Sequence, residues 1–352
     1  MYNFVFNGQP ARVVFGAGSL QYLDREMDTL GVRKVLVLCT PGQRALAGRV
    51  ADLLQSRAAG IFDRAAMHVP LEIVHEARDA ARKLAADCAV AVGGGSTIGL
   101  GKAIALESGL PILAIPCTYS GSEMTAIYGV TEGAVKKVGR DTRVLPRAVI
   151  YDPELSLTLP VGMSVTSGIN AIAHAAEGLY ASDSNPVVDL MAQEGITAIA
   201  RALPSIGGDP GNIAARSHML YGAWLCGSVL GNVGMALHHK LCHTLGGRFN
   251  LPHAETHTIV LPHALAYNAS AAPRAMLKIA RALGGHNAAQ SVFGLARDNG
   301  AAVALKHIGM RESDLDQACE LVLQDQYPNP RALERMAIRQ LLQNAFDGVR
   351  PV

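Results

Sequence analysis

The sequence lacks the features that mark several classes of protein. Its net charge at pH 7 is only +2, from 31 Lys and Arg against 29 Asp and Glu. Because nucleic-acid-binding domains usually carry a dense basic patch, which is absent, we expect no nucleic-acid partner. No uncharged apolar run reaches the roughly 18–20 residues of a membrane span. Residues 1–16 lack the basic start and apolar run of a signal peptide, so we expect a cytoplasmic protein without membrane contact.

The cysteines show no CxxC spacing, which argues against paired zinc-finger ligands and a thioredoxin-like motif. We expect reduced and mostly buried thiols. Cys242 lies among histidines and is interpreted as a small buried filler, with a ligand or a nucleophile as the alternative.

Aromatic residues are also few, at 5%, whereas hydrophobic residues make up 49% of the 352 positions and glycine occurs 36 times. This is the composition of a globular α/β protein that is long enough for two domains.

Strand and helix patterns alternate in the first 150 residues. Short β-branched apolar runs predict strands, and amphipathic segments between them predict helices. The expected strands are 34–39, 58–62, 88–96 and 111–118, and the expected helices are 44–58, 70–86 and 97–108. The alternation predicts a doubly wound parallel sheet, a Rossmann-like α/β fold.

Only helical periodicity follows residue 155. We therefore predict a dinucleotide-binding α/β domain over 1–154 and an all-α domain over 155–352 that carries the histidines. The segment 149–160 is interpreted as the linker, and 136–147 as a basic loop.

Two polar turns follow neighbouring predicted strands. "GGGST" (93–97) allows close backbone approach and opens a helix whose N-terminus favours an anion such as a pyrophosphate. "PCTYSGSEMT" (116–125) follows the next strand, and such turns at the carboxyl edge of a sheet bind nucleotides. The alternative is a capped helix start with Ser122 as the N-cap.

Histidines are concentrated in residues 238–263, which hold six of the chain's twelve. Asn170 and His174 share a helix face at i and i+4, as do His239 and His243. With His253, this set has the appearance of a metal site in which one ligand is an amide. Three histidines with a carboxylate suit a transition metal, whereas imidazoles without a metal can act as general acids.

These motifs resemble those of the iron-containing (group III) alcohol dehydrogenase family, and within it the maleylacetate reductase branch. The resemblance covers nearly the whole chain and rests on "ARVVFGAGSL" (11–20), "GGGSTIGLGKAIA" (93–105), "IPCTYSGSEMT" (115–125), "YDPEL" (151–155), "GINAIAHAAE" (168–177) and "HKLCHTLGGRFNLPHA" (239–254). It implies a Rossmann-like domain and an α-helical domain of the dehydroquinate synthase-like fold, with the active site in the cleft between them.

The resemblance also implies the residues that bind NAD. The glycine turn would hold the pyrophosphate, and the second turn would line the dinucleotide. The matching residues are Gly93, Gly94, Gly95, Ser96, Thr97, Thr118, Tyr119 and Ser122.

At the family's metal ligands, an Asp and three His, this chain has Asn170, His174, His239 and His253. His243 matches a further active-site histidine. Because an amide replaces the carboxylate, we expect the metal to be absent.

Two further departures concern the cofactor. Gly99 replaces the usual Asp of GGGSxxDxxK, and Thr40 replaces the acidic residue that accepts the adenosine ribose hydroxyls. A missing carboxylate would no longer repel a 2′-phosphate, so NADPH is expected beside NADH.

The implied function is the NAD(P)H-dependent reduction of the C=C bond of maleylacetate to 3-oxoadipate, in the degradation of aromatic compounds and without a metal. His243 is the preferred proton donor, with His239 second. His174, His253 and Asn170 would donate further hydrogen bonds. The expected partners of the substrate carboxylates are Lys136, Lys137, Arg140 and Arg143.

Three alternatives stay open. The chain could be a metal-dependent alcohol or aldehyde dehydrogenase that holds zinc or iron through three histidines. It could be a lyase like dehydroquinate synthase, or a non-catalytic relic that binds no NADH. By the same resemblance we expect a homodimer.

Overall fold

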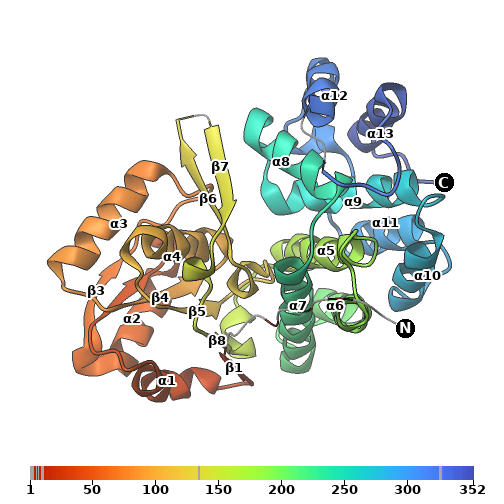
Figure 1. The fold of residues 1–352 in the computed structure, drawn as a ribbon. Coiled ribbons are helices and arrows are strands. Elements are labelled where there is room, and N and C mark those ends of the chain that lie inside the picture. The colour runs from red at the N-terminus through yellow and green to blue at the C-terminus, as the bar shows by residue number, and fades with distance from the viewer. Residues whose placement is uncertain (1–3, 5, 7, 9–11, 134, 325–326) are drawn as a thin grey trace. The chain divides into compact units, whose positions relative to one another are not determined.

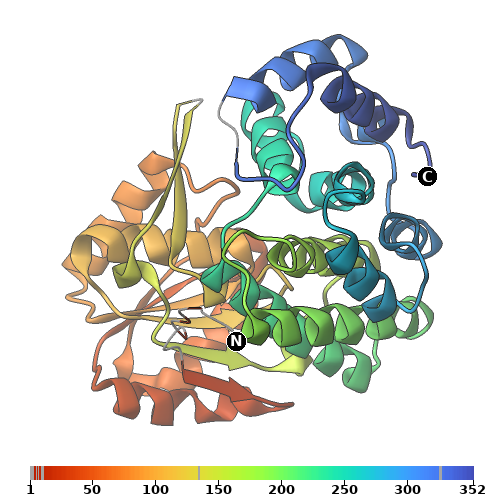
Figure 2. The ribbon, with the colours of Figure 1, turned by 45° about the vertical axis from the view of Figure 1, so that its right-hand side comes forward.

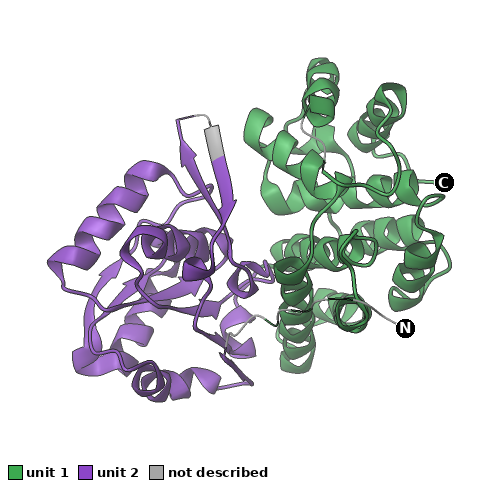
Figure 3. Cartoon of the chain, in the orientation of Figure 1, with its two compact units in different colours: residues 1–8, 160–352 green, residues 9–159 purple. Residues whose placement is uncertain are grey.

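Residues 9–159 form unit 2, an α/β unit, and residues 1–8 with 160–352 form unit 1 (Figure 3). The computed structural model describes residues 4, 6, 8, 12–133, 135–324 and 327–352. Unit 2 extends to 159 rather than to the predicted 154, and Leu155 belongs to its hydrophobic core. The supposed linker also contributes most of strand β8 to the sheet.

A parallel six-stranded sheet is the centre of unit 2. The strands are β1 (Arg12–Phe15), β2 (Val35–Leu38), β3 (Ala58–Phe62), β4 (Cys88–Gly93), β5 (Ile112–Pro116) and β8 (Ala148–Tyr151). Their order in the sheet is β1-β8-β5-β4-β2-β3. The four predicted strands and the doubly wound fold are confirmed, whereas β1 and β8 were not predicted.

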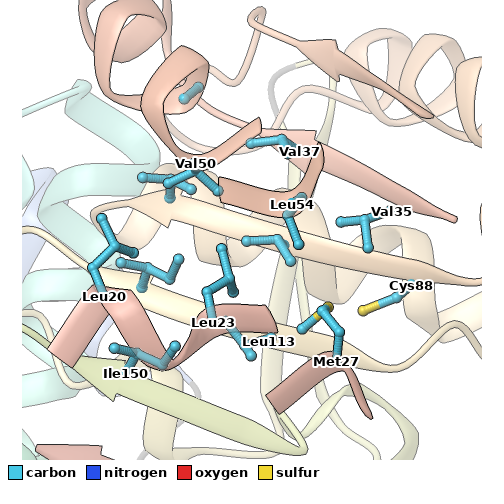
Figure 4. Packing of buried hydrophobic residues seen from close by; sticks show 14 of the residues in the cluster. Leu20, Leu23, Met27, Val35, Val37, Val50, Leu54, Cys88, Leu113 and Ile150 are labelled. Carbon is cyan, nitrogen blue, oxygen red and sulfur yellow. The ribbon is translucent and has the colours of Figure 1, made fainter. Parts of the chain in front are cut away.

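Helices cover both faces of this sheet (Figures 1 and 2). They are α1 (Leu23–Leu30), α2 (Arg44–Leu54), α3 (Leu71–Lys83) and α4 (Gly95–Ser108). Successive strand residues point to opposite faces, so Val35 and Val37 pack with α1 and α2 (Figure 4). Leu36 and Leu38 pack with α3 and α4 on the other face. This two-sided burial explains the continuous apolar character of β2.

An antiparallel hairpin extends from unit 2. It consists of β6 (Ile127–Glu132) and β7 (Val135–Arg140), with Tyr128 opposite Gly139. The interpretation of 136–147 as a loop is therefore wrong for its first half. Lys137, Val138 and Arg140 are exposed, as in a strand at the surface, and β7 pairs with β6 in the hairpin.

Unit 1 is helical in its described residues. Its helices are α5 (Val161–Gly178), α6 (Pro186–Gly208), α7 (Ile213–Asn232), α8 (Leu237–Phe249), α9 (His253–Asn268), α10 (Pro273–Ala282), α11 (Ala288–Asp298), α12 (Leu315–Gln324) and α13 (Arg335–Asp347). α5 is buried from Ser164 to Gly178. A Cβ at Gly178 would lie 2.2 Å from Val229 Cγ1, so the glycine allows α7 to approach closely. Polar side chains on α5 are therefore held in a rigid, dry environment.

No single described helix is long and apolar enough to cross a membrane. The pair α7 and α8 reaches that length and composition only jointly, across a bend of 96°.

The six cysteines are free and buried, as predicted. Burial raises the pKa of Cys39 to about 11 and the pKa of Cys88 to about 12. Cys242 is also buried, and its pKa lies well above the ordinary value for the same reason. These thiols are therefore protonated and unreactive near neutral pH, which fits packing better than nucleophilic chemistry.

Candidate active site

The glycine turn of unit 2 joins β4 to α4 and leaves no room for side chains. Gly93 has a φ of +150°, and a Cβ there would lie 2.4 Å from Gln43 Oε1 and 2.6 Å from Thr97 Oγ1. A Cβ at Gly94 would lie 2.9 Å from Thr118 Oγ1. The turn is therefore in contact with the segments that follow β2 and β5.

These three turns lie at the carboxyl edge of adjacent strands. β2 connects onward to β3 at one edge of the sheet, whereas β4 connects to β5 in the opposite direction. The point between β2 and β4 is thus a topological switch point, where open α/β sheets bind ligands.

The same edge offers groups that fit a dinucleotide. The first N–H groups of α4 face outward at Gly95 and Ser96, as at any helix N-terminus, and favour a pyrophosphate. Thr97 Oγ1 is buried and has no hydrogen-bond partner among the described residues. An orphan hydroxyl beside a bare glycine turn is what a bound polar group would satisfy.

The second predicted turn is only partly at the surface. Thr118 and Ser120 are half-buried beside Gly94 and Gly95, but Tyr119 is fully buried. Ser122 opens a short 3-10 helix (Ser122–Met124) whose N-cap is Gly121, so Ser122 is not the N-cap.

Lys102 holds that second turn in place. Its buried Nζ donates to Ser122 O at 2.6 Å, Thr125 Oγ1 at 2.9 Å and Ile127 O at 2.8 Å. Burial lowers its pKa to about 7. Lys102 therefore acts as a structural link between α4 and the turn.

Gly99, the second departure from the family pattern, has a steric explanation. A Cβ at this position would lie 2.8 Å from Val69 Cγ2. The aspartate that the family usually carries could not be accommodated here without moving the segment before α3.

The candidate catalytic groups lie in unit 1. Asn170, His174 and Glu177 follow one another at i, i+4 and i+7 on buried α5, and therefore share a face. Glu177 is fully buried and accepts hydrogen bonds from the backbone N–H groups of Ala236 and His238, both at 2.8 Å. It thus caps the start of α8 and fixes that helix to α5.

Glu177 also orients the predicted histidines. Its Oε2 lies 2.6 Å from His239 Nδ1, and His239 Nε2 lies 2.8 Å from His174 Nδ1. A carboxylate only accepts, so His239 Nδ1 carries the hydrogen. A neutral His239 then accepts at Nε2 from His174. The structure brings these two predicted residues into one hydrogen-bonded chain that ends at a carboxylate.

Two further histidines complete the cluster. His238 Nε2 lies 2.9 Å from His257 Nδ1, and the ring of His257 lies 4.4 Å from that of His253, between centroids. Burial, reinforced by the neighbouring rings, holds the pKa of His238 and of His257 well below the ordinary value. Both are therefore neutral near neutral pH. His253 itself is exposed, unlike His174 and His239.

Cys242 joins His238 and His257 in a compact buried group. One potential ligand atom from each lies within 4.8 Å of the others. Since the thiol is buried and the two rings bond to each other, we interpret this group as core packing.

His243 lies beside Tyr327 at the edge of the cluster. Its Nδ1 is 3.0 Å from the Tyr327 hydroxyl, and its ring centroid is 6.1 Å from that of His239. His243 is half-buried, which leaves it accessible to a small molecule.

The potential ligands among the described residues do not match the family's metal site of one aspartate and three histidines. Asn170 is neutral, and its buried Oδ1 has no hydrogen-bond partner among the described residues. The ring nitrogens of His174 and His239 face each other as a donor and an acceptor. Without an anionic ligand, this set is a poor fit for a divalent cation.

His263, the last histidine of the stretch, lies on another face of α9. Burial lowers its pKa to about 4, against 6.5 in the unfolded chain. Below pH 6.5 the unfolded state gains a proton that the folded state does not, so stability falls from pH 6.5 towards pH 4. We expect His263→Leu to gain about 2 kcal/mol relative to wild type between pH 7.5 and 5, as measured by urea unfolding. A constant difference between the two proteins would contradict this.

The predicted carboxylate-binding residues belong to the β6–β7 hairpin of unit 2 and the turn that follows it. Lys137 Nζ pairs with Glu132 Oε2 at 2.6 Å, and Arg143 pairs with Asp141 at 2.7 Å. Arg140 ends β7 and is exposed. Lys136 is on β7, but its side chain is outside the described part of the structure. Two of the four cations thus already have a carboxylate partner.

Four residues of the site were not predicted from the sequence: Glu177, His238, His257 and Tyr327. Glu177 could have been found, since it continues the face of Asn170 and His174. His257 follows His253 at i+4 in the same way. Tyr327 could not, because 84 residues separate it from His243 in the chain.

Comparisons with known proteins agree with this architecture. The family model "Iron-containing alcohol dehydrogenase" matches residues 10–153, and "Fe-containing alcohol dehydrogenase family, C-terminal" matches residues 164–346. A maleylacetate reductase of Burkholderia cepacia is 62% identical over 351 residues, covering 100% of both chains.

Solved structures are similar over the same length. A putative alcohol dehydrogenase from Ralstonia eutropha JMP134 has a TM-score of 0.99 at 62% identity, with full coverage of both chains. A maleylacetate reductase from Agrobacterium tumefaciens has a TM-score of 0.96 at 51% identity, again with full coverage. This chain is therefore an oxidoreductase that belongs to the iron-containing alcohol dehydrogenase family.

Proposed function

We propose that this chain reduces the C=C bond of maleylacetate to 3-oxoadipate with NADH, accepts NADPH as well, and needs no metal. The observation that carries the substrate is 62% identity along the entire chain with a maleylacetate reductase. Family membership gives the chain a nicotinamide cofactor. The residues expected to hold it are those of the glycine turn (Gly93–Thr97), Thr118 and Thr40.

The chemistry asks for little beyond hydrogen bonds and one proton. When bound, the nicotinamide supplies a hydride to one alkene carbon, and the electrons of the double bond move onto the conjugated ketone as an enolate. A proton then reaches the carbon next to the ketone. Donors aimed at the enolate oxygen can stabilise this charge without a Lewis acid.

Unit 1 offers such donors. Asn170 carries an amide that an aspartate could not replace as a donor at pH 7. Glu177 keeps His239 and His174 in fixed orientations. As an imidazolium, His243 donates from Nδ1 to the Tyr327 hydroxyl, 3.0 Å away, and can give the Nε2 proton to the substrate, which leaves a neutral imidazole.

A His243→Ala variant is expected to lose about 10²-fold in turnover, because a positioned general acid contributes that much. Affinity for NADH should not change, since the dinucleotide residues lie in unit 2. The measurement is steady-state turnover with maleylacetate beside calorimetric NADH binding. His218→Ala, an exposed histidine of α7, is the matched control. Retained turnover in His243→Ala would assign the proton to another group, with His239 the next candidate.

The proposal as a whole is tested by NADH oxidation with maleylacetate, in untreated protein and in protein dialysed against a strong chelator. We expect equal activity in both samples. Activity that is lost on chelation and restored by zinc or iron would show that Asn170 is compatible with a metal, and would overturn the metal-free part. Inactivity with maleylacetate but activity with simple alcohols or aldehydes would favour the metal-dependent dehydrogenase instead.

A further inference from the structure

Gln43 occupies the topological switch point of the sheet. It ends the 3-10 turn Pro41–Gln43 that follows β2, and it is half-buried. Its Oε1 lies 2.4 Å from the position that a Cβ of Gly93 would take. The side chain therefore lies directly over the glycine turn, where the connections after β2 and β4 leave in opposite directions.

The amide of Gln43 has a defined orientation. The Thr40 hydroxyl donates to Gln43 Oε1 at 3.3 Å. In this orientation Oε1 accepts from Thr40, and Nε2, with its two N–H groups, is the end that can donate to a ligand. No partner of Nε2 occurs among the residues that the structure describes.

The segment around this amide is uncharged, and the nearest cation in sequence is already paired with a carboxylate. The segment Cys39–Gln43 contains no acidic or basic side chain. The nearest cation in sequence, Arg44, pairs through Nε with Asp63 Oδ2 at 3.2 Å. Both partners are about half exposed, with 53% and 45% of each side chain accessible. A bound phosphate would thus find a neutral donor rather than an unpaired cation or a repelling carboxylate.

We propose that Gln43 is the residue that reads the 2′ position of the adenosine ribose and lets the chain bind both NADH and NADPH. An amide N–H can donate to a ribose hydroxyl oxygen and equally to a 2′-phosphate oxygen. A carboxylate in its place would accept from the hydroxyl and repel the phosphate. This inference rests on the proposed use of a nicotinamide dinucleotide and names the residue that sets its phosphate tolerance.

The test is calorimetric titration of the full chain with NADH and with NADPH, without substrate. Gln43→Glu preserves the shape and the acceptor for Thr40 but adds one negative charge. We expect its Kd for NADPH to rise about tenfold or more, since about 1.4 kcal/mol of repulsion has that effect, and its Kd for NADH to change by less than about threefold. Gln55→Glu is the matched control. This exposed residue lies at the far end of α2.

The outcomes separate the inference from the proposed function. Binding of both nucleotides by wild type, with equal effects of Gln43→Glu on each, would overturn the role of Gln43 and leave the reductase proposal standing. An equal loss of NADPH binding in Gln55→Glu would show a general charge effect and would also overturn it. A wild-type chain that binds neither nucleotide would overturn both.

Discussion

Glu177→Gln is expected to reduce turnover by about 10- to 100-fold, in line with other substitutions that disturb a buried carboxylate orienting a functional histidine. With its oxygen at the Oε1 position, the amide would still accept from His238 N–H at the start of α8, but it would no longer accept from Ala236 N–H, which bonds to Oε2. Opposite His239 Nδ1, however, the NH₂ group would replace an acceptor with a donor. His239 would then hold its hydrogen on Nε2, and the bond to His174 would reverse its direction.

The measurement is turnover with maleylacetate beside NADH affinity and thermal unfolding. NADH affinity should stay normal, and stability should fall by about 1–3 kcal/mol from the disturbed buried hydrogen bonds. Glu194→Gln makes the same change on the exposed face of α6 and should have no effect on turnover or on stability. A folded Glu177→Gln protein with full turnover would show that the orientation of His239 is irrelevant to the reaction.

Gly93→Ala is expected to abolish measurable NADH binding. The added Cβ would lie 2.4 Å from Gln43 Oε1 and 2.6 Å from Thr97 Oγ1, at a φ of +150° that residues with a Cβ rarely adopt. Both strain and displacement of the neighbouring side chains act on the turn that is expected to hold the pyrophosphate. We expect the dissociation constant to rise by about 100-fold or more, which corresponds to about 2.7 kcal/mol.

Calorimetric binding of NADH checks this result. Gly42→Ala is the control in the neighbouring turn, because a Cβ there meets nothing within 4 Å. Gly94→Ala meets only the Thr118 side chain, so a smaller loss is expected. Normal NADH affinity in a folded Gly93→Ala protein would place the dinucleotide elsewhere.

The inner strands of the sheet could be predicted from sequence because each one is marked by its own apolar residues. β2 and β4 are buried on both faces and read as continuous apolar runs between clear helices. β1 and β8 have only four residues each and pair with each other across a separation of more than 130 residues. Neither sequence indicates that the two segments pair with each other, and the prolines after β8 favoured a linker. The hairpin was missed because its lysines are typical of both loops and exposed strands.

The candidate site was predictable where residues repeat on one helix face. Asn170 with His174 and His239 with His243 were found in this way. The bond between His174 and His239 joins two helices 65 residues apart, and Glu177 gains its role only from donors on α8. Such tertiary contacts leave no periodic trace in the sequence. The homodimer and the carboxylate-binding cations stay predictions.

The buried thiols can serve as natural probes of local unfolding. Each unit contains three of them: Cys39, Cys88 and Cys117 in unit 2, and Cys226, Cys242 and Cys319 in unit 1. A maleimide or an aromatic disulfide reagent reaches a buried sulfur only during local or global unfolding. Labelling followed by peptide mass mapping, in native buffer and in mild urea, would thus measure the opening rate of each unit separately, without an engineered probe.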